Sequence, residues 1–233
     1  MITIQAFFFF KFDHLKKIIK DKLPTCLFFN NYPYNKEHNK LKCIFIHIPK
    51  NAGTSVLKTL SSKTKIGTGR VHERYSVYQK TSPSKFTSYE KFCIVRNPWD
   101  RLLSAYFYLF NGGNKKCDSP FCHLFKTEAP TFEVFVKKWL DIYKIYGITV
   151  LQPQLFYIYD FQNKKFMVDS ILQFENLNDD FQTFKKKIGI TKKLPRLNKS
   201  KHNNYIEYYD DEMINIVGQF YKYDIDLLKY TFK

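Results

Sequence analysis

Apolar residues in this chain follow two spacings, one typical of buried strands and one typical of helices with a single buried face. Short apolar runs predict strands at residues 42–48, 90–96, 155–160 and 167–174. Apolar residues at helical spacing predict helices that begin near residue 54 or cover 98–110, 130–143, 177–188 and 210–223. Strands that alternate with helices predict an α/β fold with three layers, in which helices cover both faces of a mainly parallel sheet. This is a P-loop-like nucleotide-binding architecture. We expect residues 111–130 to form an exposed loop or lid.

The junction between the first predicted strand and helix carries the strongest chemical signal. Backbone N–H groups at a helix N-terminus lack partners within the helix, and the helix dipole favours an anion there. Lys50 and two hydroxyl groups add donors, and we expect Gly53 to let the backbone approach a ligand closely. The candidate contacts are Lys50, Asn51, Ala52, Gly53, Thr54 and Ser55. The alternative is an ordinary strand-to-helix turn with a serine N-cap.

A second candidate anion site follows the strand predicted at residues 90–96. Arg96 ends this strand, Pro98 suits the first turn of the next helix, and Ser104 lies about two turns into it. A guanidinium group matches phosphate oxygens with two parallel hydrogen bonds, so Arg96 and Ser104 could bind a second phosphate. The alternative is a buried structural arginine that pairs with an acid.

These two motifs, in this order, resemble the cofactor-binding pair of the carbohydrate (Golgi-type) sulfotransferases. The similar branch includes chondroitin 4-O- and uronosyl 2-O-sulfotransferases with bacterial and viral relatives. Further similar segments extend the resemblance over about residues 41–232, at 152–154, 168–177, 194–200 and 221–226. The resemblance implies that the first loop holds the 5′-phosphosulfate end of 3′-phosphoadenylyl sulfate. It also implies that Arg96 and Ser104 hold the 3′-phosphate of that cofactor.

The implied reaction moves a sulfuryl group to a hydroxyl, expected on a carbohydrate, and leaves adenosine 3′,5′-bisphosphate. Lys50 is expected to neutralise the bridging oxygen as the S–O bond breaks. In the similar enzymes a catalytic histidine lies between the two motifs, which makes His72 the candidate general base and Glu73 the fallback. A loop after Pro195 closes over the adenine and 3′-phosphate in such enzymes, so Lys199 and Ser200 are candidate contacts.

The other five histidines are expected to be structural or exposed. His47 lies inside the first predicted strand and reads as a packed core residue. The remaining four occur in weakly patterned or charged stretches, so we expect them at the surface. These are His14, His38, His123 and His202.

The charge balance favours a polyanionic partner. The chain has 38 Lys and Arg against 21 Asp and Glu, a formal charge of +17. Such a charge attracts nucleic acid, anionic membranes or acidic glycans, although solvated surface lysine is an equally simple explanation. We expect a glycan acceptor, no nucleic acid and no metal. Two other classes stay open: a P-loop kinase or nucleotide hydrolase, which lacks its Gly-Lys-Ser/Thr signature here, and a non-catalytic basic protein.

The N-terminal region differs in pattern from the rest. We expect residues 1–40 to form an extension and residues 41–233 the sulfotransferase domain. Residues 1–10 are apolar, but basic residues follow them rather than precede them, and no run reaches the ~20 apolar residues of a membrane span. We therefore expect packing or weak membrane contact, and a cytoplasmic or peripheral location. Cys117 and Cys122 could form a disulfide if the compartment oxidises.

Overall fold

The computed structural model describes residues 32–61, 72–113, 119–195 and 203–233, with the backbone alone at 119–122. The described residues form two compact units, one from 32–95 with 154–195 and the other from 96–153 with 203–233. Residues 1–31 of the predicted N-terminal extension lie outside the described residues, and so do Cys117 and the side chain of Cys122. In the part of the chain that is described, no helix is both long and apolar enough for a membrane crossing.

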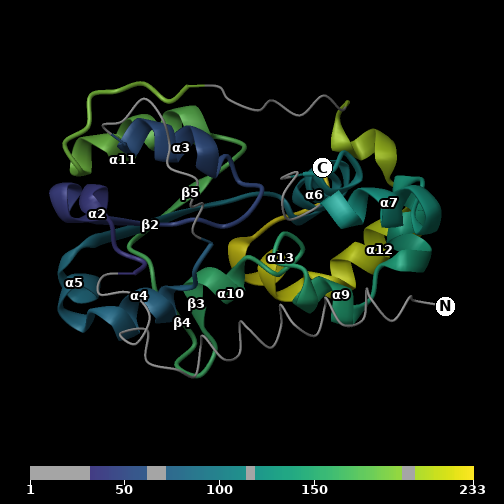
Figure 1. Cartoon of the computed structure of the whole chain (residues 1–233), viewed down its shortest axis with the longest axis horizontal. Coiled ribbons are helices and arrows are strands. Elements are labelled where there is room, and N and C mark those ends of the chain that lie inside the picture. The colour runs from purple at the N-terminus through teal and green to yellow at the C-terminus, as the bar shows by residue number, and fades with distance from the viewer. Residues whose placement is uncertain (1–31, 62–71, 114–118, 196–202) are drawn as a thin grey trace. The chain divides into compact units, whose positions relative to one another are not determined.

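The first unit is built around a parallel three-stranded sheet (Figure 1). Its strands are β1 (Cys43–Ile46), β2 (Glu90–Val95) and β5 (Ser170–Gln173), in the order β1-β2-β5. The helices of this unit are α2 (Lys36–Leu41), α3 (Gly53–Leu60), α4 (Tyr75–Thr81), α5 (Pro83–Ser88), α10 (Leu155–Ile158) and α11 (Leu177–Lys187). The predicted α/β class with a parallel sheet is confirmed.

Both faces of β1 and of most of β2 are buried, which explains why residues 43–46 and 92–95 are continuously apolar. The edge strand β5 leaves Ile171 and Gln173 exposed. Figure 1 shows α3 and α11 on one side of the sheet and α4, α5 and α10 on the other. Alternate strand residues form one cluster with Val56 of α3 and with Phe181 and Phe184 of α11. The strand members of that cluster are Cys43, Phe45, Phe92, Ile94 and Leu172. Residues between them, such as Ile44, Ile46, Cys93 and Val95, are also buried.

The second unit is helical in its described residues. Its elements are α6 (Pro98–Phe110), α7 (Ser119–Glu128), α8 (Phe132–Val134), a π-helical segment (Phe135–Trp139), α9 (Ile142–Gly147), a 3₁₀ turn (Tyr205–Tyr208), α12 (Asp211–Phe220) and α13 (Lys222–Leu228). Its core is largely aromatic. Phe125 contacts Tyr106, Phe135 and Trp139 with ring centroids 4.8–5.9 Å apart.

A buried arginine of α6 and a tyrosine at the junction of α12 and α13 hold residues 150–152, which follow α9. Arg101 is 1% exposed, and its guanidinium donates to the carbonyl oxygens of Val150, Leu151 and Gln152, the last at 2.7 Å. Tyr221 places its ring 5.5 Å from the guanidinium carbon and donates its hydroxyl to Leu151 O at 2.6 Å. A buried charge is tolerated when it is hydrogen-bonded in this way.

Several predicted boundaries are correct for identifiable reasons. α11 ends at Lys187, and Gly189 adopts a left-handed φ of 67° while Ile190 N donates to Lys185 O. Thr131 caps α8 through its hydroxyl, which accepts from Val134 N at 3.2 Å. The helix predicted over 130–143 is interrupted, however, because Leu140 is extended and Asp141 caps a new helix.

Three other predictions are wrong. Residues 155–160 begin as a helical turn, and only Tyr159–Asp160 (β3) form a strand, antiparallel to Lys165–Phe166 (β4). A short apolar run does not distinguish a strand from a buried helical turn. The lid predicted at 111–130 contains α7, which buries Phe125 completely. His38, expected at the surface, is 7% exposed and contacts Tyr34 and Tyr78, whereas His123 is exposed as predicted.

The buried His38 predicts a pH-dependent stability. Burial lowers the pKa of His38 from 6.5 to about 4. The unfolded chain binds a proton at this residue below about pH 6.5, while the folded chain does so only below about pH 4. The contribution of His38 is therefore complete above pH 6.5 and is lost as the pH falls toward 4, by up to about 3 kcal/mol. Urea unfolding across this range should show a smaller pH dependence for His38→Gln than for the wild type, and parallel curves would contradict the prediction.

Candidate active site

The loop between β1 and α3 has an unusual backbone. Lys50 and Ala52 adopt φ angles of 70° and 57°, in the left-handed region. Each such residue other than glycine costs on the order of 1–2 kcal/mol, and such conformations persist mainly where surrounding contacts enforce them. Alternation of backbone handedness can turn successive N–H groups toward one point, which makes a concave site for an anion.

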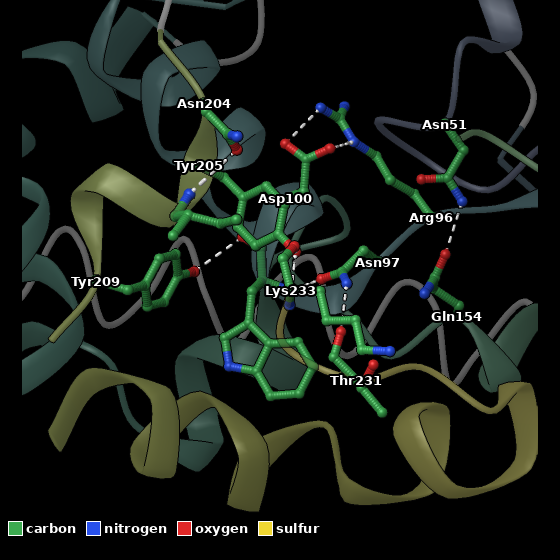
Figure 2. Close-up of polar contacts among 12 residues, drawn as sticks. Asn51, Arg96, Asn97, Asp100, Gln154, Asn204, Tyr205, Tyr209, Thr231 and Lys233 are labelled. Atoms are coloured by element: carbon green, nitrogen blue, oxygen red, sulfur yellow. Dashed lines mark hydrogen bonds and ion pairs between the residues drawn. The ribbon is translucent and has the colours of Figure 1, made fainter. Parts of the chain in front are cut away.

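Asn51 supplies the contact that holds this loop. Asn51 is 1% exposed, and its Nδ2 donates to Ile94 O at the end of β2 at 2.7 Å. The same nitrogen donates to Gln154 Oε1, also at 2.7 Å (Figure 2). Gln154 is itself fully buried. The side-chain nitrogen of Asn51 therefore binds the loop to the sheet, and the backbone of this residue is the part that could face a ligand.

The first turn of α3 contains no acidic residue, and its N-cap side chain makes no capping hydrogen bond. That N-cap residue is Ala52. The alternative of a serine N-cap is therefore wrong, because Ser55 is the third residue of the helix and is buried. Lys50 and Thr54 are half-buried. This helix start therefore offers backbone N–H groups, a lysine and a hydroxyl, a combination that favours an anion.

Gly53 is required for a reason that the sequence did not reveal. Its φ lies outside the left-handed region, so the backbone alone does not demand glycine. A methyl group at this position would lie 1.8 Å from His47 Nε2 and 2.0 Å from His47 Cδ2. The small residue thus makes room for the imidazole of His47, whereas the expectation was room for a ligand.

His47 connects the loop to the candidate base. Its ring is 5% exposed, stacks on Phe45 with centroids 5.4 Å apart, and lies 4.1 Å from the ring of His72. His72 Nδ1 is 3.0 Å from the carbonyl oxygen of His47. A carbonyl oxygen can only accept, so this contact places a proton on Nδ1 and makes Nε2 the basic nitrogen of a neutral His72.

The residues after His72 are held by separate elements. The Tyr32 hydroxyl donates to the carboxylate of Glu73, and the Arg74 guanidinium lies 5.1 Å from the ring centroid of Phe156. Glu73, the fallback base, is therefore hydrogen-bonded to Tyr32. The pKa of Tyr32 is raised by burial and by this carboxylate, which keeps its hydroxyl protonated as the donor.

In the second unit, Arg96 forms an ion pair that explains its burial. It is 5% exposed, and its Nε and Nη2 donate to the two carboxylate oxygens of Asp100 at 2.7 and 2.8 Å (Figure 2). Asp100 and Ser104 are four residues apart on α6 and therefore share a face of the helix. The structural pairing considered for Arg96 is present, and its phosphate contact stays a prediction.

Asn97 and Pro98, which follow Arg96 in sequence, fix the start of α6. The Asn97 side-chain oxygen accepts from Trp99 N at 3.1 Å, and its Nδ2 donates to Thr231 O at 2.9 Å. The indole nitrogen of Trp99 donates to Ile214 O, and the Tyr209 hydroxyl donates to Trp99 O. The C-terminal part of the chain thereby holds the helix that carries Asp100 and Ser104.

The structure brings together one set of the predicted residues and leaves others untested. Within the first unit it groups residues 50–55 with His72 through His47. Arg96 and Ser104 belong to the second unit, where they are described by themselves. Lys199 and Ser200 lie outside the described residues. The sequence analysis gave no role to Gln154 and placed His47 only in the core. The spacing of apolar residues does not show that these two side chains lie beside the loop.

The contact between Gly53 and His47 predicts a reversal in a double mutant. Gly53→Ala should destabilise the protein by about 1–3 kcal/mol, because the new methyl group overlaps the His47 ring. In a His47→Ala background the same change should cost nothing or stabilise, since alanine is favoured over glycine within a helix by about 0.5–1 kcal/mol. Urea unfolding measures both values.

Gly218→Ala is the matched control, because a methyl group there would meet Trp99 at an ordinary 3.8 Å. It should be neutral or stabilising in either background. An equal cost of Gly53→Ala with and without the His47 ring would refute the steric explanation.

Comparison of the sequence with known proteins identifies its family. A model of the sulfotransferase family matches residues 34–231. An uncharacterised protein of Archaeoglobus fulgidus is 32% identical over 133 residues, which is 56% of this chain and 94% of that protein. No solved structure gave a significant match. Because the family match spans most of the sequence, the chain belongs to the sulfotransferase family.

Proposed function

We propose that this sulfotransferase moves a sulfuryl group from 3′-phosphoadenylyl sulfate to a carbohydrate hydroxyl, with His72 as the general base. The observation that carries the proposal is the contact between His72 Nδ1 and His47 O, made by the strand end that leads into the Lys50 loop. This contact leaves Nε2 as the basic atom in a segment that also presents an anion-binding helix start.

The residues of the first loop fit the phosphosulfate end of such a cofactor. The uncapped start of α3 and the half-buried Lys50 favour an anion, and the left-handed Lys50 and Ala52 shape the backbone around it. 3′-Phosphoadenylyl sulfate would supply an activated sulfuryl group. Lys50 would then stabilise the charge that develops on the leaving oxygen, and Thr54, Ser55 and the N–H groups near Gly53 would hold the phosphate.

His72 would act on the acceptor. Its Nε2 takes the hydroxyl proton while the acceptor oxygen forms its bond to sulfur and the bond to the bridging oxygen breaks. The hydrogen bond at Nδ1 stabilises the imidazolium that results, because a carbonyl oxygen interacts more strongly with a charged donor. By analogy with phosphoryl transfer, the remaining roles of the protein in sulfuryl transfer are to position the reactants and to stabilise the charge that develops on the leaving oxygen.

Arg96 and Ser104 are proposed to bind the 3′-phosphate. The ion pair with Asp100 uses Nε and Nη2 and sets the plane of the guanidinium. An arginine with a fixed plane loses little entropy on binding an anion, and Ser104, one turn beyond Asp100, would add a hydroxyl donor. Lys199 and Ser200 remain further proposed contacts.

A carbohydrate acceptor is supported by the resemblance to carbohydrate sulfotransferases and by the charge of +17, which suits acidic glycans. Transfer of labelled sulfate to uronic-acid glycans, compared with neutral glycans and with RNA, would test this part of the proposal. Labelling of none of the glycans would contradict it.

The cofactor assignment predicts a nucleotide preference. Isothermal titration of the full chain should show tighter binding of adenosine 3′,5′-bisphosphate than of ATP, with no magnesium required. Tighter, magnesium-dependent binding of ATP would instead support a kinase or nucleotide hydrolase.

Removal of either cationic group should weaken that binding. Lys50→Ala and Arg96→Ala should each raise the dissociation constant for adenosine 3′,5′-bisphosphate about 10–100-fold, because each removes a charge-assisted hydrogen bond. Lys58→Ala, which removes an exposed lysine from the other end of α3, is the control. The double variant Arg96→Ala/Asp100→Asn shows whether a stranded Asp100 carboxylate explains any effect of the Arg96 change. Unchanged affinity in both the single and the double variant would contradict the role of Arg96.

His72→Ala should separate turnover from binding. Removal of a general base lowers kcat about 10²–10⁴-fold, while the affinity for adenosine 3′,5′-bisphosphate should stay within about 3-fold of wild type. Rates of sulfate transfer and isothermal titration measure the two effects. An unchanged rate of transfer would show that His72 is not the base.

A further inference from the structure

His47 is placed where the cofactor loop and the candidate base meet. Its ring touches three groups: the face of Phe45 on β1, the ring of His72 before α4, and the Cα of Gly53 at the start of α3. All three contacts lie within the first unit. The imidazole is 5% exposed, so it is packed in rather than turned to solvent.

Two of these contacts fix His72 in different ways. The carbonyl of His47 accepts from Nδ1 and thereby selects the tautomer, while the His47 ring, 4.1 Å away and tilted by 44°, limits the rotation of the His72 ring about its side-chain bonds. A hydrogen bond to one atom leaves such rotation open. The ring contact is therefore needed to aim Nε2 in one direction.

The third contact, with Gly53, restricts movement of the His47 ring itself. An added methyl group at Gly53 would lie within 2.6 Å of three ring atoms, Nε2, Cδ2 and Cε1, so this edge of the imidazole lies directly against the helix backbone. Phe45 stacks on the ring with an interplanar angle of 20°. The orientation of His47 is thus set by the strand and by the first turn of the cofactor helix.

We propose that His47 is a positioning residue, whose imidazole holds His72 Nε2 in line with the sulfuryl group bound at the start of α3. The same ring contacts the helix start and the base, so it sets the distance and direction between them. This inference rests on the proposed function. Errors of about 1 Å in the position of a reacting group can lower a rate about 100-fold, so such a residue influences turnover without contacting substrate.

The kinetic test compares two variants in two backgrounds. His47→Ala removes the ring, and His47→Gln keeps a planar polar group of similar length in case the cavity left by alanine prevents folding. Each should lower kcat about 10-fold or more, with the KM for 3′-phosphoadenylyl sulfate and the affinity for adenosine 3′,5′-bisphosphate within about 3-fold of wild type. In a His72→Ala background the further loss of kcat should be under about 2-fold, because there is no base left to position.

His38→Gln is the matched control, since His38 is also a buried histidine of the first unit but contacts Tyr34 and Tyr78. It should leave kcat within about 2-fold of wild type. A purely structural role of His47 would lower kcat by the same factor with and without His72, and that result would overturn the proposal. An unchanged kcat in both His47 variants would overturn it as well.

A second readout does not depend on activity. Nitrogen chemical shifts of the His72 ring, measured by NMR, should show a protonated Nδ1 and an unprotonated Nε2 in the wild type and in His38→Gln. The backbone carbonyl that selects this tautomer remains in His47→Ala and His47→Gln, so the nitrogen shifts should persist there. NMR order parameters of the His72 ring C–H groups should instead fall in these two variants, because the contact that limits ring rotation is lost, and equal order parameters in all four proteins would refute the proposal. If His72→Ala retains full activity, the base assignment fails, and the order parameters of the His72 ring still report whether the His47 ring fixes it.

Discussion

The hydrogen bonds of Asn51 are the constraint on which the rest of the site depends. Two non-glycine residues of the β1–α3 loop are left-handed, and that geometry needs a contact that outweighs its cost. Asn51 lies between them and donates both side-chain N–H groups to the sheet and to Gln154. The donors are buried, so their loss would leave Ile94 O and Gln154 Oε1 without this partner in a dry environment. These buried hydrogen bonds hold the loop against the sheet and thereby orient the start of α3.

The same short segment also determines the chemistry of the candidate base. The carbonyl of His47 selects the tautomer of His72, and the next few residues form the loop that carries Lys50. An enzyme that transfers a charged group must keep the base, the leaving-group cation and the anion donors in one frame. In the proposed reaction, one strand end supplies or contacts each of these groups within the first unit. In the second unit, two hydrogen bonds to Asp100 set the guanidinium plane of Arg96.

Much of the fold was predictable because burial leaves a strong pattern in sequence. The strands at Cys43 and Glu90 and the helix from Pro98 have long apolar repeats and clear end signals, and they occur where predicted. The apolar run at 155–158 is too short to distinguish the spacing of a helix from that of a strand, and it forms a helical turn. The strand–loop–helix junction that carries Lys50 and Gly53 also occurs where predicted, and its role in binding an anion stays a prediction. The contacts of Gly53 with His47 and of Asn51 with Gln154 join residues 6 and 103 positions apart, and only packing reveals which side chains meet.

The most direct test of the central claim is a crystal structure of the full chain with adenosine 3′,5′-bisphosphate. The account predicts the 5′-phosphate against Lys50 and the N–H groups at the start of α3, the 3′-phosphate against Arg96 and Ser104, and an open position before His72 Nε2 for the acceptor. A nucleotide whose phosphates contact neither the Lys50 loop nor Arg96 would contradict it.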